Sequence, residues 1–480
     1  MCDSCLLLGV PLDACRGPRD RGKSCESSNI VTLLAWFLFV SCSILLLIVP
    51  RRFAPVPLLV GCCYMTMGQG INIGAASMPF YRMMLLVGMS RVVVKGERIQ
   101  ALGNPIDKIV AVLMAWLVLA SFFHDGVLGS GPVYILGIIF NFAGAYFLIR
   151  TWCRDLSDAS SIIALLAFIL APLALSMVAE KLTGKNPFHV FGGVPENVAF
   201  REGKLRAQGP FRHPILAGTV GAVCIPLFIG ILRQNRLAGS VGIIAGTAMT
   251  LASASSGPMM SAIVSVCAVI MWYFRQYTRM ARLSAVAAYI AAQIYWGEPG
   301  YYIMKRIDLS GGSTGYHRAR LIESAFENFN EWWLFGTDFT RHWMPTGVSW
   351  SPYHADITNY YLAFAVNGGL AAMLLMIAIL LIAFRWVGLM CIEKSDSPSE
   401  AFTVWCLGAG LFAHAATSIS VSYFDQSLVF FWMNVALISG LYANLSTARE
   451  ADVEDEYERD TEPPANEQLR AATVAGRAKF

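Results

Sequence analysis

The sequence predicts an all-α, polytopic helical membrane protein, and three observations lead to that expectation. Hydrophobic residues make up 56% of the 480 residues, and charged residues make up only 14%. Soluble domains carry about 25% charged residues, so this chain is unusually poor in charge. Apolar stretches of about 20 residues, the length that a helix needs to cross a bilayer, recur along the chain. These stretches are continuous rather than alternating, which argues against a membrane β-barrel.

Thirteen apolar segments are candidate membrane spans, and short polar turns separate most of them. They cover residues 30–50, 54–76, 79–95, 107–123, 132–150, 158–178, 213–233, 237–254, 257–275, 281–297, 358–385, 401–421 and 424–444.

Two long polar segments and the two ends of the chain complete the predicted organisation. We expect an N-terminal segment (1–29), an N-terminal transmembrane bundle (30–178), an outer loop with a basic cluster (179–212), central transmembrane helices (213–297), a large outer, periplasmic loop (298–357), C-terminal transmembrane helices (358–445) and a disordered cytoplasmic tail (446–480). The tail is acidic, contains proline and is poor in apolar residues, a composition typical of disorder.

Basic residues indicate the orientation of the chain. If the C-terminal tail is cytoplasmic, the short loops with Arg150, Arg233, Arg275 and Arg385 are cytoplasmic too, as the positive-inside rule requires. Both long loops then lie outside. Thirteen spans would also place the basic residues near the N-terminus outside. We therefore expect about 12–13 spans, and favour twelve with both ends inside and one early segment that does not cross.

Positive charge gathers in the first outer loop, against that rule. The thirteen residues 201–213 contain one acid, Glu202, and five basic residues, Arg201, Lys204, Arg206, Arg212 and His213. Guanidinium groups present a rigid fork of donors that suits phosphate oxygens. Snorkelling of these side chains to the membrane interface is the alternative explanation. The sequence predicts diphosphate-binding side chains at Arg206, Arg212, His213, Arg318 and Arg320.

The second outer loop carries aromatic and acid–base candidates. The stretch STGYHRARLIESAFENFNEWWLFGTD is typical of an amphipathic helix, with Trp332 and Trp333 after it. These two rings are candidates to stack on sugar faces, although an interfacial belt also explains them. His354 and Asp356 precede the next span and are candidate general bases. Asp356 or Thr358 could instead cap the following helix.

The motifs that signal other chemistry are missing from the sequence. It has no P-loop, no GxGxxG after a strand, no HExxH and no GxSxG. The Cys2 and Cys5 pair has C-x-x-C spacing, but its partners are too loosely spaced for a zinc site. We therefore expect no nucleotide hydrolysis, no metal site, no cofactor and no nucleic-acid partner.

Three motifs around the two loops resemble those of a known family. They are Arg206-x-x-Gly209-x-Phe211-x-x-Pro214, then Gly315-x-x-Arg318 followed by EWWLFGTD, and finally TNYYLAFAVNGGL. In order and spacing they are similar to the superfamily of O-antigen ligases and Wzy-type polysaccharide polymerases, over roughly residues 80–445. Two positions depart from that pattern. Thr358 stands where the family has a His, and SASSGP stands where many members have Ser-Arg-Gly.

The resemblance implies a GT-C-like glycosyltransferase of the bacterial inner membrane with its active site facing the periplasm. Such enzymes move a glycan from an undecaprenyl-diphosphate carrier to an acceptor, without a nucleotide sugar or an obligatory metal. The acceptor is lipid A core in ligases and another lipid-linked repeat in polymerases. A transporter or flippase of lipid-linked glycans, or a non-catalytic envelope polysaccharide assembly protein, are the alternatives.

Overall fold

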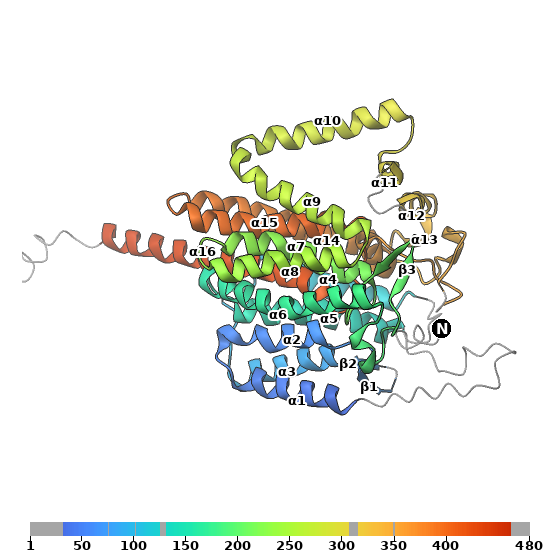
Figure 1. Ribbon diagram of the computed structural model, residues 1–480. Coiled ribbons are helices and arrows are strands. Elements are labelled where there is room, and N and C mark those ends of the chain that lie inside the picture. The colour runs from blue at the N-terminus through green and yellow to red at the C-terminus, as the bar shows by residue number, and fades with distance from the viewer. Residues whose placement is uncertain are drawn as a thin grey trace, which may run out of the picture.

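A computed structural model describes residues 32–74, 76–100, 102–124, 131–306, 315–348 and 351–461, with side chains to residue 447. Within these residues the protein is mostly helical, and most helices run along a shared axis (Figure 1). The predicted N-terminal segment (1–29) and residues 462–480 of the predicted tail lie outside the described residues.

Each of the thirteen predicted segments contains a helix in the described chain. These helices are α1 (Leu33–Ile48), α2 (Pro55–Tyr64), α3 (Phe80–Val94), α4 (Pro105–Ser121), α5 (Gly131–Trp152), α6 (Leu156–Thr183), α7 (Pro214–Ile231), α8 (Arg236–Ala252), α9 (Ser256–Ile270), α10 (Thr278–Trp296), α14 (Tyr360–Glu393), α15 (Pro398–Ser418) and α16 (Leu428–Thr461).

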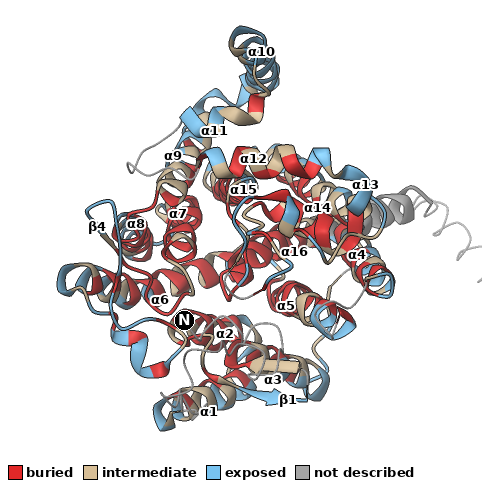
Figure 2. Cartoon of the chain, turned by 90° about the vertical axis from the view of Figure 1, so that its right-hand side faces the viewer, coloured by how far each residue is buried: buried red, intermediate tan, exposed pale blue. Residues whose placement is uncertain are grey.

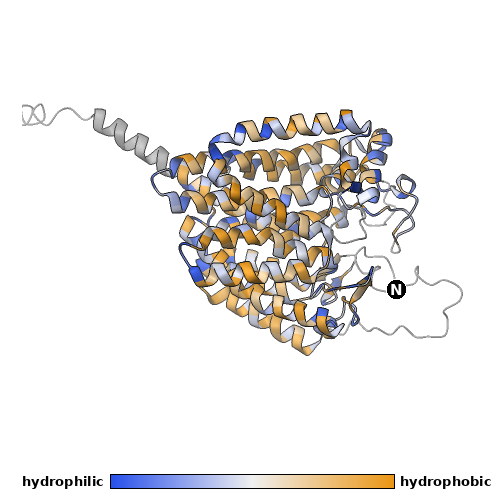
Figure 3. Ribbon diagram, turned by 45° about the horizontal axis from the view of Figure 1, so that its top comes forward, coloured by the Kyte–Doolittle hydropathy of each residue, from blue (hydrophilic) through white to orange (hydrophobic). Residues whose placement is uncertain are grey.

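Seven helical segments of the described chain are long and apolar enough to cross a membrane, as expected of a multi-pass membrane protein. One of them, Ser256–Trp296, runs through α9 and α10, and α1 and α8 are shorter apolar helices. Figure 3 shows apolar residues along the sides of the helices. The helix α16 continues to Thr461, so the prediction of disorder from residue 446 was wrong for 446–461. That stretch is rich in Ala, Glu and Arg, which favour helix.

The smaller elements gather at one end of the bundle (Figure 1). The two outer loops contribute most of them, and the segment between α2 and α3 contributes one hairpin. Two antiparallel hairpins lie there, and the amphipathic helix predicted in the second loop is confirmed as α12. The elements are β1 (Gly70–Ile73), β2 (Ala76–Pro79), η4 (Pro187–Phe191), β3 (Ala199–Arg201), β4 (Lys204–Arg206), η6 (Gly300–Tyr302), α11 (Ile303–Arg306), α12 (Gly315–Glu327), α13 (Phe329–Trp332) and η7 (Arg341–Trp343).

Helix α7 forms the centre of the bundle and packs against α8, α9 and α15. Almost every residue of α7 is buried. It meets α8 closely because Gly221 and Gly246 face each other: a Cβ added to Gly221 would lie 2.6 Å from the carbonyl oxygen of Gly246. Helix α10 is the opposite case. It has no buried residue and stands apart from the bundle (Figure 2).

The described chain begins and ends at opposite ends of the bundle. The backbone N–H of Thr32 donates to Gln69 Oε1 (3.0 Å), and the Gln69 amide donates to Phe191 O in the first outer loop. The start of α1 therefore lies at the outer-loop end. Helix α16 leaves at the other end (Figure 1). The arrangement with both ends inside stays a prediction, because residues 1–31 lie outside the described ones. Helix α2 is short, but the chain still passes from one end of the bundle to the other there (Figure 1).

Candidate functional site

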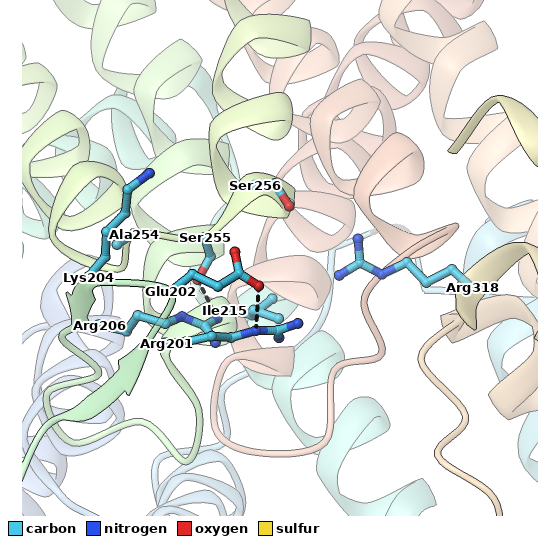
Figure 4. Close-up of a pocket in the computed structure, with 10 residues that line it drawn as sticks. Arg201, Glu202, Lys204, Arg206, Ile215, Ala254, Ser255, Ser256 and Arg318 are labelled. Carbon is cyan, nitrogen blue, oxygen red and sulfur yellow. Dashed lines mark hydrogen bonds and ion pairs between the residues drawn. The ribbon is translucent and has the colours of Figure 1, made fainter. Parts of the chain in front are cut away.

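A pocket at the outer-loop end is formed by the β3–β4 hairpin, the first turn of α9 and the side chain of Arg318 from α12. Segments far apart in the sequence thus meet at one place (Figure 4). The pocket is lined by Arg201, Glu202, Lys204, Arg206, Ile215, Ala254, Ser255, Ser256, Gly257 and Arg318.

Arg206 reaches the pocket from the last position of β4. Its hairpin turns tightly because Glu202 and Gly203 both adopt positive φ (51° and 76°), the geometry of a two-residue hairpin turn. The guanidinium Nη2 donates to Ser255 Oγ (2.6 Å) at the start of α9. Arg206 is only 8% exposed, and its Nε is buried with no hydrogen-bond partner among the described residues.

Arg318 enters from α12, facing Arg206 across the pocket (Figure 4). It is also 8% exposed, and its Nε is likewise buried with no partner in the described part of the chain. The guanidinium lies against the first turn of α9, since a Cβ added to Gly257 would be 4.0 Å from Arg318 Nη2. Both arginines thus keep a buried N–H donor that no described residue accepts.

The first turn of α9 adds further donors. Ser255 occupies the N-cap position but makes no side-chain cap. Its hydroxyl donates to Ser253 O (2.9 Å), and its oxygen accepts from Arg206. The backbone N–H groups of Ser256 and Gly257 therefore receive no cap from Ser255, whereas Pro258 has no N–H. The positive end of the helix dipole favours an anion here.

The electrostatics of the pocket favour an anion. Four of its lining residues are cationic and one, Glu202, is acidic, and Glu202 lies 3.6 Å from Arg201. Burial lowers the pKa of Arg206, and the nearby positive charge of Arg201 lowers it further. Burial also lowers the pKa of Arg318. Both guanidinium groups remain charged, so a bound anion would relieve the cost of burying them.

Carboxylates and amides beneath the pocket hold the loop that follows Arg206. Glu180, fully buried near the end of α6, accepts the backbone N–H groups of Gln208 (2.9 Å) and Gly209 (2.8 Å). Asn186 donates to Gly209 O (2.8 Å). Gly209 has φ +57°, so this turn requires a residue that tolerates the left-handed region.

The loop between α15 and α16 supports the same segment from the other side. Asp425, fully buried, accepts the backbone N–H of Arg212 (3.0 Å), and burial raises the pKa of its carboxyl. Gln426 donates to Pro210 O (3.1 Å). Sequence reasoning missed Glu180, Asp425 and Gln426. An acid three residues before the end of an apolar helix was the only signal for Glu180.

Arg212 and His213 do not line the pocket, although both were predicted to bind the diphosphate. The Arg212 guanidinium lowers the pKa of Asp425, so it faces that carboxylate. His213 is the N-cap of α7, and its Nδ1 accepts the N–H of Ile215 (3.1 Å). Burial, followed by the charge of Arg206, lowers the pKa of His213 to about 4. His213 is therefore a neutral cap at neutral pH.

The two candidate bases lie in different surroundings. Asp356 faces Arg318 and His317, and burial raises the pKa of its carboxyl while these two neighbours lower it. His354 Nδ1 instead pairs with Ser351 Oγ (2.7 Å), and its ring is near Asp338. Of the two, only Asp356 acts electrostatically on Arg318, and neither of them lines the pocket.

The start of α14 has a different cap from the one suggested by the sequence. Asn359 Oδ1 accepts the N–H of Leu362 (3.0 Å) and caps the helix. The suggestion that Asp356 or Thr358 caps α14 was therefore wrong. The hydroxyl of Thr358 is buried without a partner among the described residues.

The remaining predicted residues are not among those that line the pocket. Arg320 pairs with Glu323 (2.5 Å) and Glu327 (2.9 Å) on its own helix. Trp332 is buried, and its Nε1 donates to Ala325 O (2.7 Å). Trp333 is 47% exposed. The structure therefore brings Arg206 and Arg318 together in one pocket, with Asp356 acting electrostatically on Arg318. Arg320 and Trp333 are not among the lining residues.

Among the residues that the structure describes, no three His, Cys, Asp or Glu side chains are grouped to hold a metal ion. In comparisons with known proteins, no family model and no curated protein matches this chain.

Proposed function

We propose that the protein is a membrane glycosyltransferase that moves or polymerises a glycan from an undecaprenyl-diphosphate carrier onto an acceptor hydroxyl at the outer face of the inner membrane. The observation that carries the proposal is the convergence of Arg206 and Arg318, from two separate outer loops, on one pocket. There each keeps a buried Nε that has no partner in the described part of the chain. The motif resemblance supports the same reaction class, in which no metal is obligatory.

The proposed reaction is a displacement at the anomeric carbon. The acceptor oxygen forms the new glycosidic bond, the bond from the anomeric carbon to the diphosphate oxygen breaks, and its electron pair stays on the diphosphate. Arg206 and Arg318 stabilise the charge that develops there. Losing one such preorganised donor typically costs about 3–4 kcal/mol, or about 10²–10³-fold in rate.

Asp356 is the proposed base, and it takes the proton of the acceptor hydroxyl. Arg318 acts electrostatically on this carboxyl. An acceptor hydroxyl beside a diphosphate bound at Arg318 would therefore lie near Asp356. A carboxylate with a raised pKa is also a better proton acceptor than an ordinary one. His354 is the less favoured base because its ring is engaged with Ser351 and faces Asp338.

The proposal includes a GT-C-like arrangement and a topology. With all thirteen helices of the predicted segments crossing the membrane, both outer loops face the periplasm and the end of α16 faces the cytoplasm. The basic loops at Arg150, Arg233 and Arg275 then lie on the cytoplasmic side, in agreement with the positive-inside rule.

A transporter or flippase of the same lipid is the alternative, and the distribution of charge favours the enzyme. A transporter is expected to place charged side chains near the middle of its spans. In the described helices the buried charges occupy first or last turns, near the helix ends: Arg91, Asp107, Arg150, Asp158 and Glu180.

The test is deletion in the native host, with surface polysaccharide separated by size and the gene restored as wild type, Arg206→Ala or Arg320→Ala. Single-repeat chains on the acceptor after deletion indicate a polymerase, and free lipid-linked polymer beside a bare acceptor indicates a ligase. We expect Arg206→Ala to fail and Arg320→Ala, whose guanidinium is paired elsewhere, to restore the wild-type pattern.

Two results would overturn the proposal. If deletion leaves the polysaccharide unchanged, the protein is not the transferase. If lipid-linked glycan accumulates on the cytoplasmic leaflet, the protein is a flippase.

A further inference from the structure

A second cavity lies beneath α12, and its volume is about 170 Å³. One wall comes from the outer loop and the other from the start of α14. It is lined by Ile322, Ala325, Phe326, Trp332, Asn359, Tyr361, Leu362 and Met373.

Three polar side-chain atoms of these lining residues are already engaged. The Tyr361 hydroxyl donates to Ala415 O (2.9 Å), and Trp332 Nε1 donates to Ala325 O. Asn359 Oδ1 accepts the N–H of Leu362. The cavity therefore presents almost only hydrocarbon. Such a lining suits a hydrocarbon chain rather than a polar group, which would lose its hydrogen bonds there.

The cavity adjoins the anion pocket along one helix. Arg318 reaches the pocket, and Ile322, four residues later, lines the cavity. Residues four apart on an α-helix share a face and are separated by about 6 Å along the axis. The anion site and the apolar cavity therefore follow one another along the same face of α12.

We propose that this cavity holds the first isoprene units of the carrier lipid whose diphosphate lies at Arg206 and Arg318. The inference rests on the proposed function. In a prenyl diphosphate the hydrocarbon begins directly at the phosphate oxygen, so the two sites must adjoin. A phospholipid has a glycerol and two esters between its phosphate and its chains, and a sugar would need hydrogen-bond partners that this cavity lacks. Trp332 then contacts the prenyl chain rather than a sugar ring.

The first experiment compares the binding of farnesyl diphosphate and inorganic pyrophosphate to the purified full chain. We expect farnesyl diphosphate to bind at least tenfold more tightly. Ala325→Leu and Met373→Trp fill the cavity, and each should remove most of that preference without changing pyrophosphate affinity. Arg206→Ala should weaken both ligands.

The second experiment does not require filling a buried site. Phe326 lines the cavity but is 66% exposed, so Phe326→Cys should leave the fold intact. A maleimide should label this cysteine above the wild-type background, and farnesyl diphosphate should protect it while pyrophosphate should not.

The outcomes separate this inference from the proposed function. Equal affinity for the two ligands, with no protection of Phe326→Cys, would overturn the prenyl assignment while leaving the diphosphate site standing. Equal protection by a lysophosphatidic acid would assign the cavity to a membrane phospholipid instead. If neither diphosphate binds and Arg206→Ala changes nothing, the diphosphate site itself is wrong, and the prenyl assignment fails with it.

Discussion

At the scale of single residues, the two pocket arginines are the most informative feature. A buried charge without a partner is costly, and proteins usually pair it or use it. Arg206 makes one bond to a neutral hydroxyl, and Arg318 faces Asp356, yet each leaves a buried Nε unsatisfied. A bound diphosphate would satisfy both.

Replacement of these arginines by lysine tests whether the guanidinium fork matters beyond its charge. Lysine keeps the charge but binds as a single point and loses the bidentate geometry. We expect Arg206→Lys and Arg318→Lys each to lower transfer activity by about 10²-fold, measured by glycan transfer with purified protein. The matched control is Arg320→Lys, which should retain wild-type activity; a loss as large as that of Arg206→Lys would contradict the assignment.

His213 predicts a specific dependence of stability on pH. Its pKa in the folded protein is about 4, below the value of about 6.5 for an unfolded chain. Between these values the unfolded state binds more protons, so stability rises with pH. The stability that the folded state gains from a neutral His213 is fully present above about pH 6.5 and is lost as the pH falls towards 4.

The variant His213→Asn isolates this effect, because asparagine also caps helices but does not titrate. We expect the Tm of the wild type, relative to that of His213→Asn, to fall as the pH is lowered from 7 to 4. Thermal unfolding in detergent at a series of pH values measures the difference. A Tm difference that stays constant with pH would show that His213 is not the titrating group.

At the scale of elements, the loop after β4 is held by buried groups on both sides. The Glu180 carboxylate accepts two backbone N–H groups from below, and Asp425 and Gln426 bond to the other end of the loop. Because β4 ends at Arg206, these contacts fix where the guanidinium lies. Glu180 and Asp425 are thus positioning residues rather than catalytic ones.

Replacing Glu180 by glutamine should destabilise this loop. The amide oxygen can accept one N–H, but the amide nitrogen would face the second, and an unsatisfied buried donor costs about 1–3 kcal/mol. We expect a lower Tm and weaker pyrophosphate binding, measured together on purified protein. Glu196→Gln is the control, because Glu196 is exposed and pairs only with Lys185 among the described residues. Equal effects of the two substitutions would refute the role of Glu180.

At the scale of the whole molecule, the shared pocket constrains the topology. Arg206 and Arg318 can line one pocket only if both outer loops lie on the same side of the membrane. Helix α10, which has no buried residue, lies between them in the sequence and returns the chain to that side (Figure 1). The proposed topology takes this side as the exterior, in agreement with the positive-inside rule.

Alkaline phosphatase fusions test this orientation directly, because the enzyme is active only outside the cytoplasm. We expect high activity for fusions after Gly203 and Gly297, and low activity after Gln234 and Ser395. High activity after Gln234, with low activity after Gly203, would place the pocket in the cytoplasm and contradict the proposed reaction.

The sequence by itself determined the helices and the two outer loops, because hydrophobicity and amphipathic spacing are properties of neighbouring residues. It also pointed to Arg206 and Arg318, since charge on the unexpected side of a membrane is visible without a structure. It could not separate Arg318 from Arg320, because the difference is which way each side chain points.

Only the tertiary structure decided which candidates meet. It paired Arg320 with Glu323 and Glu327, made His213 a neutral cap, and paired His354 with Ser351. It also revealed Glu180 beneath the loop and the apolar cavity under α12. The physical reason is that burial, pairing and enclosure depend on contacts between segments that are distant in the sequence, as Arg206 and Arg318 are.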